Sequence, residues 1–354
     1  MDHPIIPFLQ RLVRAQSISG NEHAAIAVWA EAAEAAGFTA HVSGRNVYLE
    51  HRVDDGPALL FNSHLDTVKA SDSWTRDPWD GALEEGRVHG LGANDAKASV
   101  AAQLGAAIRI AESGAPVNVV VCASCDEETG GEGMEVIAKD LPRYEAAVIG
   151  EPNDFAIAAG QRGLVKGYLR IPGQRAHASR PWQGRNAVHA AARVIARVEA
   201  SHLNVPEDLT KATAQVTMIE GGVQSNVLPD TCVMTVDCRT TPEFDNAAMV
   251  AHLQAAAASE GGVFEVYSNR FLPVHTPSDS DLVAAAMDVM GTQPTVFPSV
   301  CDLFWVGHVP SVVMGPGKPP RSHQADEFVR VDEVLEGIDR YVAIATKWSA
   351  RARS

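Results

Sequence analysis

The sequence predicts an α/β fold, with a mostly parallel sheet that helices cover on both faces and with an inserted α+β domain. Unbroken apolar runs over residues 58–68, 117–124 and 146–152 are typical of buried strands, and a helical segment, 96–113, separates the first two. Such runs indicate parallel strands because both faces of these strands are covered. At 354 residues and 46% hydrophobic composition, the chain is long enough for two domains.

From about residue 165 the pattern changes. Strand character is found over residues 164–173, 212–222, 230–240 and 263–270, and helical character over 186–202 and 246–262. This order, βαββαβ, is that of a ferredoxin-like domain. Helical patterns over 280–291 and 333–350 then restore the α/β character. We therefore expect a catalytic domain made of residues 1–162 and 271–354 around an inserted dimerisation or lid domain, 163–270.

The charge balance argues against polyanionic partners. The chain has 29 basic and 44 acidic residues, a formal net charge of −15, so we expect it to bind neither nucleic acid nor a membrane. The segment MDHPIIPFLQRL lacks the basic flank and apolar core of a signal peptide, and no window approaches about eighteen apolar residues. A cytoplasmic location is the resulting expectation.

Two short motifs suggest chemistry that their surroundings do not support. Cys122 and Cys125 form a CxxC that could be a redox or metal pair, but no second CxxC completes a four-thiolate site. We interpret both as buried strand cysteines. The run GLGAND, residues 90–95, partly matches a dinucleotide fingerprint, but Asp95 replaces its third glycine and would repel a phosphate.

Histidines and acidic residues gather at the ends of the predicted strands. They are His64, Asp66, Asp95, Glu127, Glu128, Glu151 and His323. In open α/β sheets the site lies beyond the carboxyl ends of the strands, so these side chains are expected to converge. Any one of them alone would be a surface acid or a capping residue, but the set is typical of a metal site. Histidine and carboxylate ligands without thiolates suit Zn²⁺ or a similar cation.

The motifs follow one another in the order of a known enzyme family. They are SHLDTV, GANDAK, DEETGG, GEP, AHASRPWQGRNAV, GGVQSNVLPDTC with DCRTTP, and GPGKPPRSHQADEFV, and they span nearly the whole chain. In these motifs the sequence resembles the zinc-dependent group of aminoacylases, carboxypeptidase-G and succinyl-diaminopimelate desuccinylases. Within that group, the stretch WTRDPWDGALEEGRVHGLGANDAKAS resembles acetylornithine deacetylases.

The resemblance implies a centre with two divalent metal ions, Zn²⁺ or Co²⁺. The ligands of one ion would be His64, Asp95 and Glu151. The ligands of the second would be Asp95, Glu128 and His323. Asp95 would therefore bridge the two ions.

Two further acidic residues would serve this centre. Asp66 would stand behind His64 and fix its tautomer, since both lie on one side of a strand. Glu127 would take a proton from the water that bridges the two metal ions. It would then deliver that proton to the leaving amine. Because side chains alternate along an extended chain, the neighbours Glu127 and Glu128 are expected to face different ways.

The remaining candidates concern the substrate. By resemblance, His177 of the inserted domain would donate a hydrogen bond to the oxyanion from the partner subunit of a homodimer. Asn226 and Arg239 would bind a substrate α-carboxylate, which a guanidinium can hold with two parallel hydrogen bonds. Gly315 and Gly317 would let the backbone approach the ligand closely.

The predicted reaction is removal of the acetyl group from N²-acetyl-L-ornithine. The same chemistry on N-acetyl-citrulline, N-succinyl-diaminopimelate, a carrier-linked lysine amide or a dipeptide stays open, because no identified residue fixes the side-chain partner. Relatives usually have Ser or Thr where Cys301 precedes Asp302, which leaves one substrate contact undefined. A catalytically silent protein that only binds a ligand is a further alternative, although the full ligand set argues against it.

Overall fold

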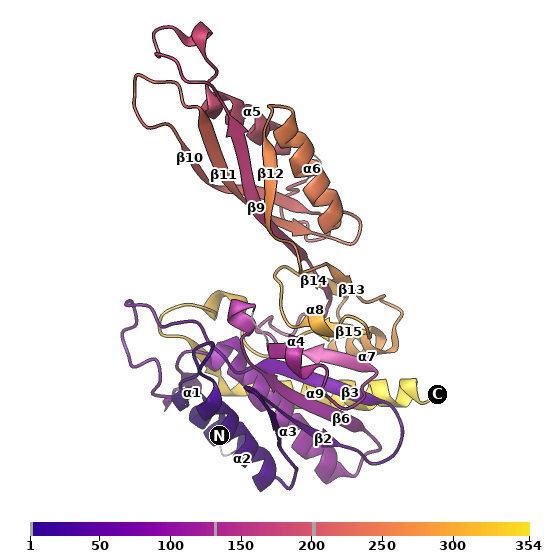
Figure 1. The fold of residues 1–354 in the computed structure, drawn as a ribbon. Helices are drawn as coiled ribbons and strands as arrows, with labels where there is room; N and C mark the ends of the chain where they lie inside the picture. The colour runs from indigo at the N-terminus through magenta and orange to yellow at the C-terminus, as the bar shows by residue number, and fades with distance from the viewer. Residues whose placement is uncertain (1–2, 131–132, 200–202) are drawn as a thin grey trace. The chain divides into compact units, whose positions relative to one another are not determined.

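The computed structural model describes residues 3–130, 133–199 and 203–354. It divides into two compact units. The first comprises the chain up to Gly160 together with Thr276–Thr295 and Cys301–Ser354, and the second comprises Gln161–His275 and Val296–Val300. Figure 1 shows that segments from both ends of the sequence build the first unit.

A single twisted sheet forms the centre of the first unit. Seven of its nine strands are, in spatial order, β1 (His41–Ser43), β2 (Asn46–His51), β6 (Asn118–Ser124), β3 (Ala58–His64), β7 (Ala146–Ile149), β15 (Ser311–Val313) and β8 (Ala158–Gln161). The four central strands, β6, β3, β7 and β15, are parallel to one another. Antiparallel strands flank them on both sides.

The apolar runs of the sequence become the buried strands. Every residue of β3, β6 and β7 is buried. Because side chains alternate between the two faces of a sheet, complete burial means that both faces are covered. The predicted α/β fold with a central, mostly parallel sheet is therefore confirmed.

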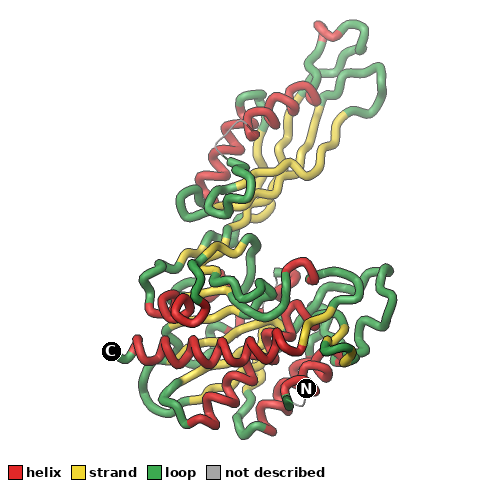
Figure 2. Tube along the Cα trace, turned by 180° about the vertical axis from the view of Figure 1, so that it is seen from behind, coloured by secondary structure: helices red, strands yellow, loops and turns green. Residues whose placement is uncertain are grey.

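The helices of the first unit pack against one another in series. They are α1 (Ile5–Arg14), α2 (His23–Ala35), α3 (Ala98–Ser113), α4 (Gly133–Ile137), α7 (Asp281–Met290), α8 (Leu303–Val306) and α9 (Val331–Ala352). Helix α1 contacts α2 and α3, α3 contacts α9, and α9 contacts α7. Figure 2 shows α9 as the long helix that ends at the C-terminus. Small side chains along α3 are almost all buried, which allows this close helix packing.

A small antiparallel sheet lies beside the metal-binding candidates. It consists of β16 (Phe328–Arg330), β5 (Arg87–His89) and β4 (Leu83–Glu84). It joins the segment before Asp95 to the segment after His323, because His89 pairs with Phe328. Two parts of the chain that are more than two hundred residues apart in sequence are thereby held in register.

The second unit has its own sheet and its own core. Its elements follow the order β9 (Gly163–Pro172), α5 (Ala187–Glu199), β10 (Thr213–Gly221), β11 (Thr231–Thr240), α6 (Asn246–Ala258) and β12 (Val263–Ser268). The four strands are antiparallel in the order β10-β11-β9-β12. Apolar side chains from the sheet and both helices form a separate cluster. The short strands β13 (Val274–His275) and β14 (Thr295–Phe297) lie in sequence where the chain passes between the units.

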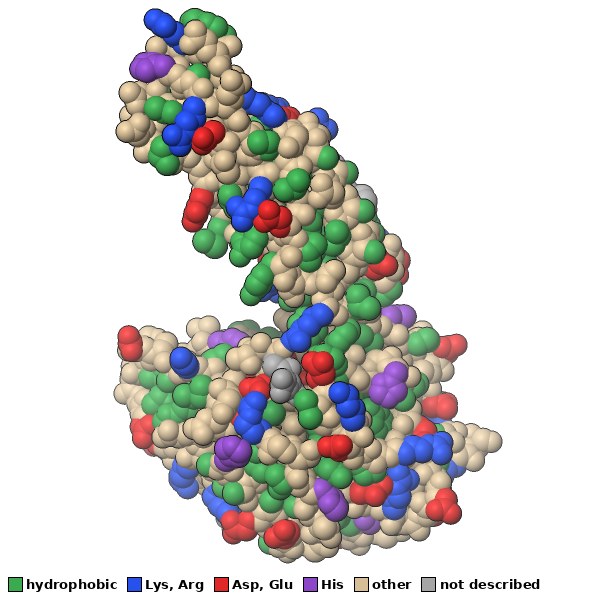
Figure 3. Space-filling model, in the orientation of Figure 1, with side chains coloured by type: hydrophobic (Ala, Val, Ile, Leu, Met, Phe, Trp, Pro, Cys, Tyr) green, Lys and Arg blue, Asp and Glu red, His purple; other side chains and the backbone are tan. Residues whose placement is uncertain are grey.

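Surface charge is mixed. Figure 3 shows acidic and basic side chains interspersed on the visible face of the first unit. Among the described residues, no helix has the length and apolar character needed to cross a membrane.

Candidate metal centre

The candidate residues converge at the carboxyl ends of the parallel strands. His64 is the last residue of β3, Glu127 and Glu128 follow β6, and Glu151 follows β7 by two residues. Asp95 lies in the segment Ala93–Lys97 that immediately precedes α3, and its own backbone is extended, with φ −120° and ψ 96°. Parallel strands end at the same edge of a sheet, which explains why side chains so distant in sequence meet here.

These side chains form two groups that share one carboxylate. In each group, one ligand atom per residue lies within 4.8 Å of the others. The groups are His64, Asp95, Glu151 and Asp95, Glu128, His323. They are the two sets that the sequence predicted, and Asp95 belongs to both.

Direct contacts hold this arrangement together. The His64 Nε2 atom lies 3.2 Å from Oδ1 of Asp95. The Nε2 atom of His323 lies 3.0 Å from Oε1 of Glu128 and 3.6 Å from Oδ2 of Asp95. Each oxygen of the Asp95 carboxylate is thus directed to a different histidine.

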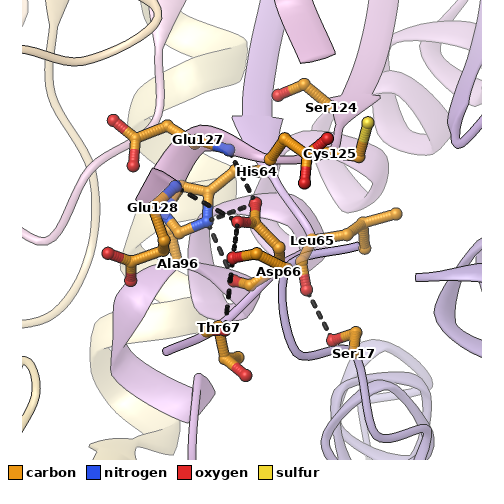
Figure 4. Close-up of polar contacts among 12 residues, drawn as sticks. Ser17, His64, Leu65, Asp66, Thr67, Ala96, Ser124, Cys125, Glu127 and Glu128 are labelled. Carbon is orange, nitrogen blue, oxygen red and sulfur yellow. Dashed lines mark hydrogen bonds and ion pairs between the residues drawn. The ribbon is translucent and has the colours of Figure 1, made fainter. Parts of the chain in front are cut away.

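Asp66 makes more contacts than the sequence predicted. Its Oδ1 atom lies 3.4 Å from Nδ1 of His64. The same carboxylate accepts the backbone N–H groups of Glu127 and Glu128, both at 3.1 Å, and the Ser19 hydroxyl at 2.6 Å. Figure 4 shows the contacts of Asp66 with His64 and with the glutamate pair as dashed lines. It therefore positions three candidate residues at once.

One geometric expectation for Asp66 was wrong. Strand β3 ends at His64, so Asp66 does not share a strand face with it. Asp66 lies just beyond the strand, and the Nδ1 atom of His64 lies 3.0 Å from the Asp66 carbonyl oxygen. The carbonyl accepts from Nδ1, which leaves Nε2 free to act as a ligand.

The explanation offered for the adjacent glutamates was also wrong. Strand β6 ends at Ser124, and Glu127–Thr129 form a turn of 3₁₀-helix rather than an extended segment. Asp126 before this turn has a left-handed backbone with φ 55°. The turn, and not strand alternation, therefore sets the different directions of Glu127 and Glu128. Gly131 of the same motif lies outside the described residues.

Burial and neighbouring charges shift the pKa values of the acidic residues and histidines of the centre. Burial raises the pKa of Glu127 and of Glu151 well above the usual glutamate range, and neighbouring carboxylates add to both effects. For His64, burial alone would lower the pKa, but hydrogen bonds to Asp66 and Asp95 raise it. The hydrogen bond to Glu128 raises the pKa of His323 to about 9.

The residues present fit a pair of divalent cations. The centre concentrates buried carboxylates around two histidines, and among the described residues no lysine or arginine forms an ion pair with its five members. Buried carboxylates are stable when they are paired or coordinate metal. Imidazole and carboxylate donors without thiolate match Zn²⁺ and related ions.

A third acidic group lies next to this centre but carries its own cation. Glu22, Cys125 and Asp126 also offer ligand atoms within 4.8 Å of one another. The Arg45 guanidinium forms ion pairs with Glu22, at 2.6 Å, and with Asp126. Both carboxylates of this group are therefore paired with a cation from the chain itself. Sequence motifs gave no signal for it, because Glu22 and Arg45 come from separate loops.

The predicted residues of the second unit form their own arrangement. His177 pairs with Val227 in an isolated antiparallel bridge, and Ala178 donates its backbone N–H to the carbonyl of Asn226 at 2.9 Å. His177 and Asn226 are both exposed on these adjoining segments. Arg239 lies on β11, and its Nε donates to Oδ1 of Asp237 at 2.9 Å.

Both predicted glycines have packing reasons of their own. A side chain on Gly315 would place Cβ 2.5 Å from the Ser99 hydroxyl and 2.7 Å from the Glu151 carbonyl oxygen. Gly317 has φ +89°, and a Cβ there would lie 2.4 Å from Oδ1 of Asn94. Each residue must be glycine for the turn beside the centre to close.

Comparison with known proteins identifies the family. Residues 60–347 match peptidase family M20/M25/M40. The chain belongs to this family. Its members hydrolyse amide bonds with bound metal, so this M20 protein is a metal-dependent hydrolase. The family resemblance read from the motifs is confirmed at this level.

Relatives of the M20 protein cover nearly its whole length. A probable carboxypeptidase of Aspergillus clavatus is 31% identical over 388 residues, which cover 99% of this chain and 84% of the relative. A proposed succinyl-diaminopimelate desuccinylase, DapE, of Mycobacterium tuberculosis is 28% identical and covers 87% of each chain. The solved structure of Bacillus subtilis YXEP, a dinuclear metal-binding peptidase, has a TM-score of 0.71 at 16% identity over 97% of this chain and 96% of its own. That likeness shows a shared fold.

Proposed function

We propose that this M20 protein is a two-metal amidohydrolase that releases the acyl group of small N-acyl amino acids, with N²-acetyl-L-ornithine as its substrate. The observation that carries the proposal is the sharing of Asp95 between two ligand groups, His64 with Glu151 and Glu128 with His323. A carboxylate that lies between two ion sites can hold both cations of a dinuclear centre. Zn²⁺ suits these donors, and Co²⁺ accepts the same set.

The metal ions would supply two effects, since bound divalent cations lower the pKa of water and polarise an amide carbonyl. The protein supplies the proton transfers. Glu127 takes a proton from the attacking water while the new carbon–oxygen bond forms. It then gives that proton to the amine nitrogen as the carbon–nitrogen bond breaks. The products are a carboxylic acid and an amine, and transfer of the acid's proton to the amine leaves a carboxylate and an ammonium group. Asp66 holds Glu127 in place through the backbone N–H group of Glu127.

The second unit would contribute substrate contacts. We assign oxyanion stabilisation to His177 and α-carboxylate binding to Asn226 and Arg239. Exposure of His177 and Asn226 on adjoining segments supports a joint role, because both are available to a ligand. No side chain fits at Gly315 or Gly317, so any contact of these residues with a substrate would be made by their backbone groups.

A homodimer through the inserted domain accompanies this proposal. Strand β10 lies at an edge of its sheet and exposes Met218 and Ile219 at 58% and 51%. An exposed apolar edge strand favours pairing with a second chain. Sedimentation should therefore show a dimer, and Ile219→Lys should shift it towards monomer. A wild-type protein that sediments as a monomer would contradict this part of the proposal.

Substrate choice needs a direct comparison. The resemblance of residues 74–99 to acetylornithine deacetylases supports acetylornithine, whereas the relationship to DapE favours a succinyl-diaminopimelate alternative. Turnover of both should be measured beside N-acetyl-citrulline, N-acetyl-lysine and a dipeptide. We expect kcat/KM to be highest for acetylornithine, which would give a cytoplasmic role in arginine biosynthesis. Preference for another amide would retain the chemistry and replace the substrate.

A further inference from the structure

Two buried side chains connect the segment that carries Asp95 to the segment that carries His323. Glu327 is 2% exposed, and its Oε1 atom accepts the backbone N–H groups of Asn94, at 2.7 Å, and Asp95, at 3.0 Å. Its backbone carbonyl also accepts the N–H group of Gly90 at 2.9 Å. One residue of the His323 segment therefore fixes the backbone from which the Asp95 carboxylate projects.

Asn94 makes the reciprocal connection. This side chain is fully buried, and its Oδ1 atom accepts the backbone N–H of Lys318 at 2.9 Å. Its Nδ2 atom donates to the Lys318 carbonyl and to the Ser322 hydroxyl, both at 3.2 Å. Ser322 directly precedes His323. Contacts therefore run from each segment to the backbone of the other.

The cost of burying these groups argues for a function beyond packing. An apolar residue could fill the volume of Glu327 without the desolvation cost of a carboxylate. The Oε1 atom of Glu327 accepts two consecutive backbone N–H groups, so one side chain holds both peptide groups at Asp95. The residue held in this way bears the carboxylate that both ligand groups share.

We propose that Glu327 and Asn94 are positioning residues that set the separation between Asp95 and His323, and thereby the affinity for the second metal ion. The inference rests on the proposed two-metal function. It concerns the group of Asp95, Glu128 and His323, because only this group takes ligands from both connected segments. The other group draws His64 and Glu151 from strand ends that the sheet already fixes.

The test measures metal binding and not only turnover. Metal-stripped wild type, Glu327→Ala, Glu327→Gln and Asn94→Ala are titrated with Co²⁺ by calorimetry, and the visible absorption of bound Co²⁺ is recorded. We expect the affinity for the first ion to fall less than that for the second, because the sheet holds His64 and Glu151 while Asp95 is common to both groups. The second should bind Glu327→Ala and Asn94→Ala about 10- to 100-fold more weakly, with altered absorption. Glu327→Gln should restore much of the affinity, since its amide oxygen can accept the same N–H groups.

A matched control separates this effect from general loss of a carboxylate. Glu145 accepts the backbone N–H of Ala58 at 2.8 Å, at the opposite end of β3 from His64, so Glu145→Ala should leave both affinities unchanged. Unchanged binding of the second ion by a folded Glu327→Ala would overturn the inference. If Glu327→Ala does not fold, Asn94→Ala decides in the same way. A wild type that binds fewer than two ions would instead refute the proposed function.

Discussion

Two acidic clusters lie at the carboxyl end of the same sheet, and they differ in the source of their positive charge. The metal-centre cluster consists of His64, Asp95, Glu128, Glu151 and His323. The Arg45 cluster consists of Glu22, Asp126 and Arg45, and its guanidinium forms an ion pair with each carboxylate. Convergence of acidic side chains is common to both. The comparison shows that a cluster of acidic side chains indicates a metal site where no lysine or arginine of the described residues pairs with it.

Removing the shared carboxylate should have the largest effect. Asp95→Asn should abolish binding of both ions in a calorimetric Zn²⁺ titration, because Asp95 belongs to both ligand groups. Several kcal/mol of transition-state stabilisation would be lost, so kcat/KM should fall by about 10³-fold or more. Asp126→Asn, the matched change in the Arg45 cluster, should leave two ions bound. Equal metal loss in the two variants would remove the distinction between the clusters.

Removing the proton carrier should affect turnover without affecting metal. Glu127→Gln has the same shape but cannot accept a proton, so kcat should fall by about 10² to 10⁴-fold. Metal content, measured by elemental analysis, should stay at the wild-type value because Glu127 is in neither ligand group. Wild-type turnover by this variant would eliminate Glu127 as the base.

Removing the cation of the Arg45 cluster should lower the stability of the fold. Arg45→Met leaves the buried Glu22 carboxylate, whose side chain is 0% exposed, without its cation. Breaking such a pair is destabilising, and because Arg45 is partly exposed we expect a loss of about 1–3 kcal/mol in the free energy of unfolding. Urea unfolding measures this loss, and Glu22→Gln in the same chain should recover part of it. Loss of metal with unchanged stability would reverse the assignment.

The smallest effect is expected for Cys125. Burial raises the pKa of its thiol to about 12, so the thiol is protonated at neutral pH, and Cys125 belongs to neither ligand group of the metal centre. Cys125→Ser should keep both ions and nearly all activity, as elemental analysis and an initial-rate assay would show. Metal loss in this variant would return the CxxC to consideration as a ligand pair.

Sequence reasoning located the metal-centre cluster because its members follow strands that apolar runs predict. His64, Glu128 and Glu151 each stand just beyond such a run, and parallel topology brings those ends together. It could not predict the 3₁₀ turn at Glu127, since that turn depends on contacts with Asp66 from another segment. Nor could it assign a role to Arg45 or Glu327, because their contacts join segments that are distant in sequence.

The most direct test is a metal titration of the stripped protein with N²-acetyl-L-ornithine turnover recorded at each addition. The account predicts that activity appears on adding Zn²⁺ or Co²⁺ and reaches its maximum at two ions per chain. Asp95→Asn should stay inactive throughout, and Asp126→Asn should follow the wild type. Full turnover without added metal, or saturation of both binding and activity at a single ion, would contradict the shared-carboxylate centre.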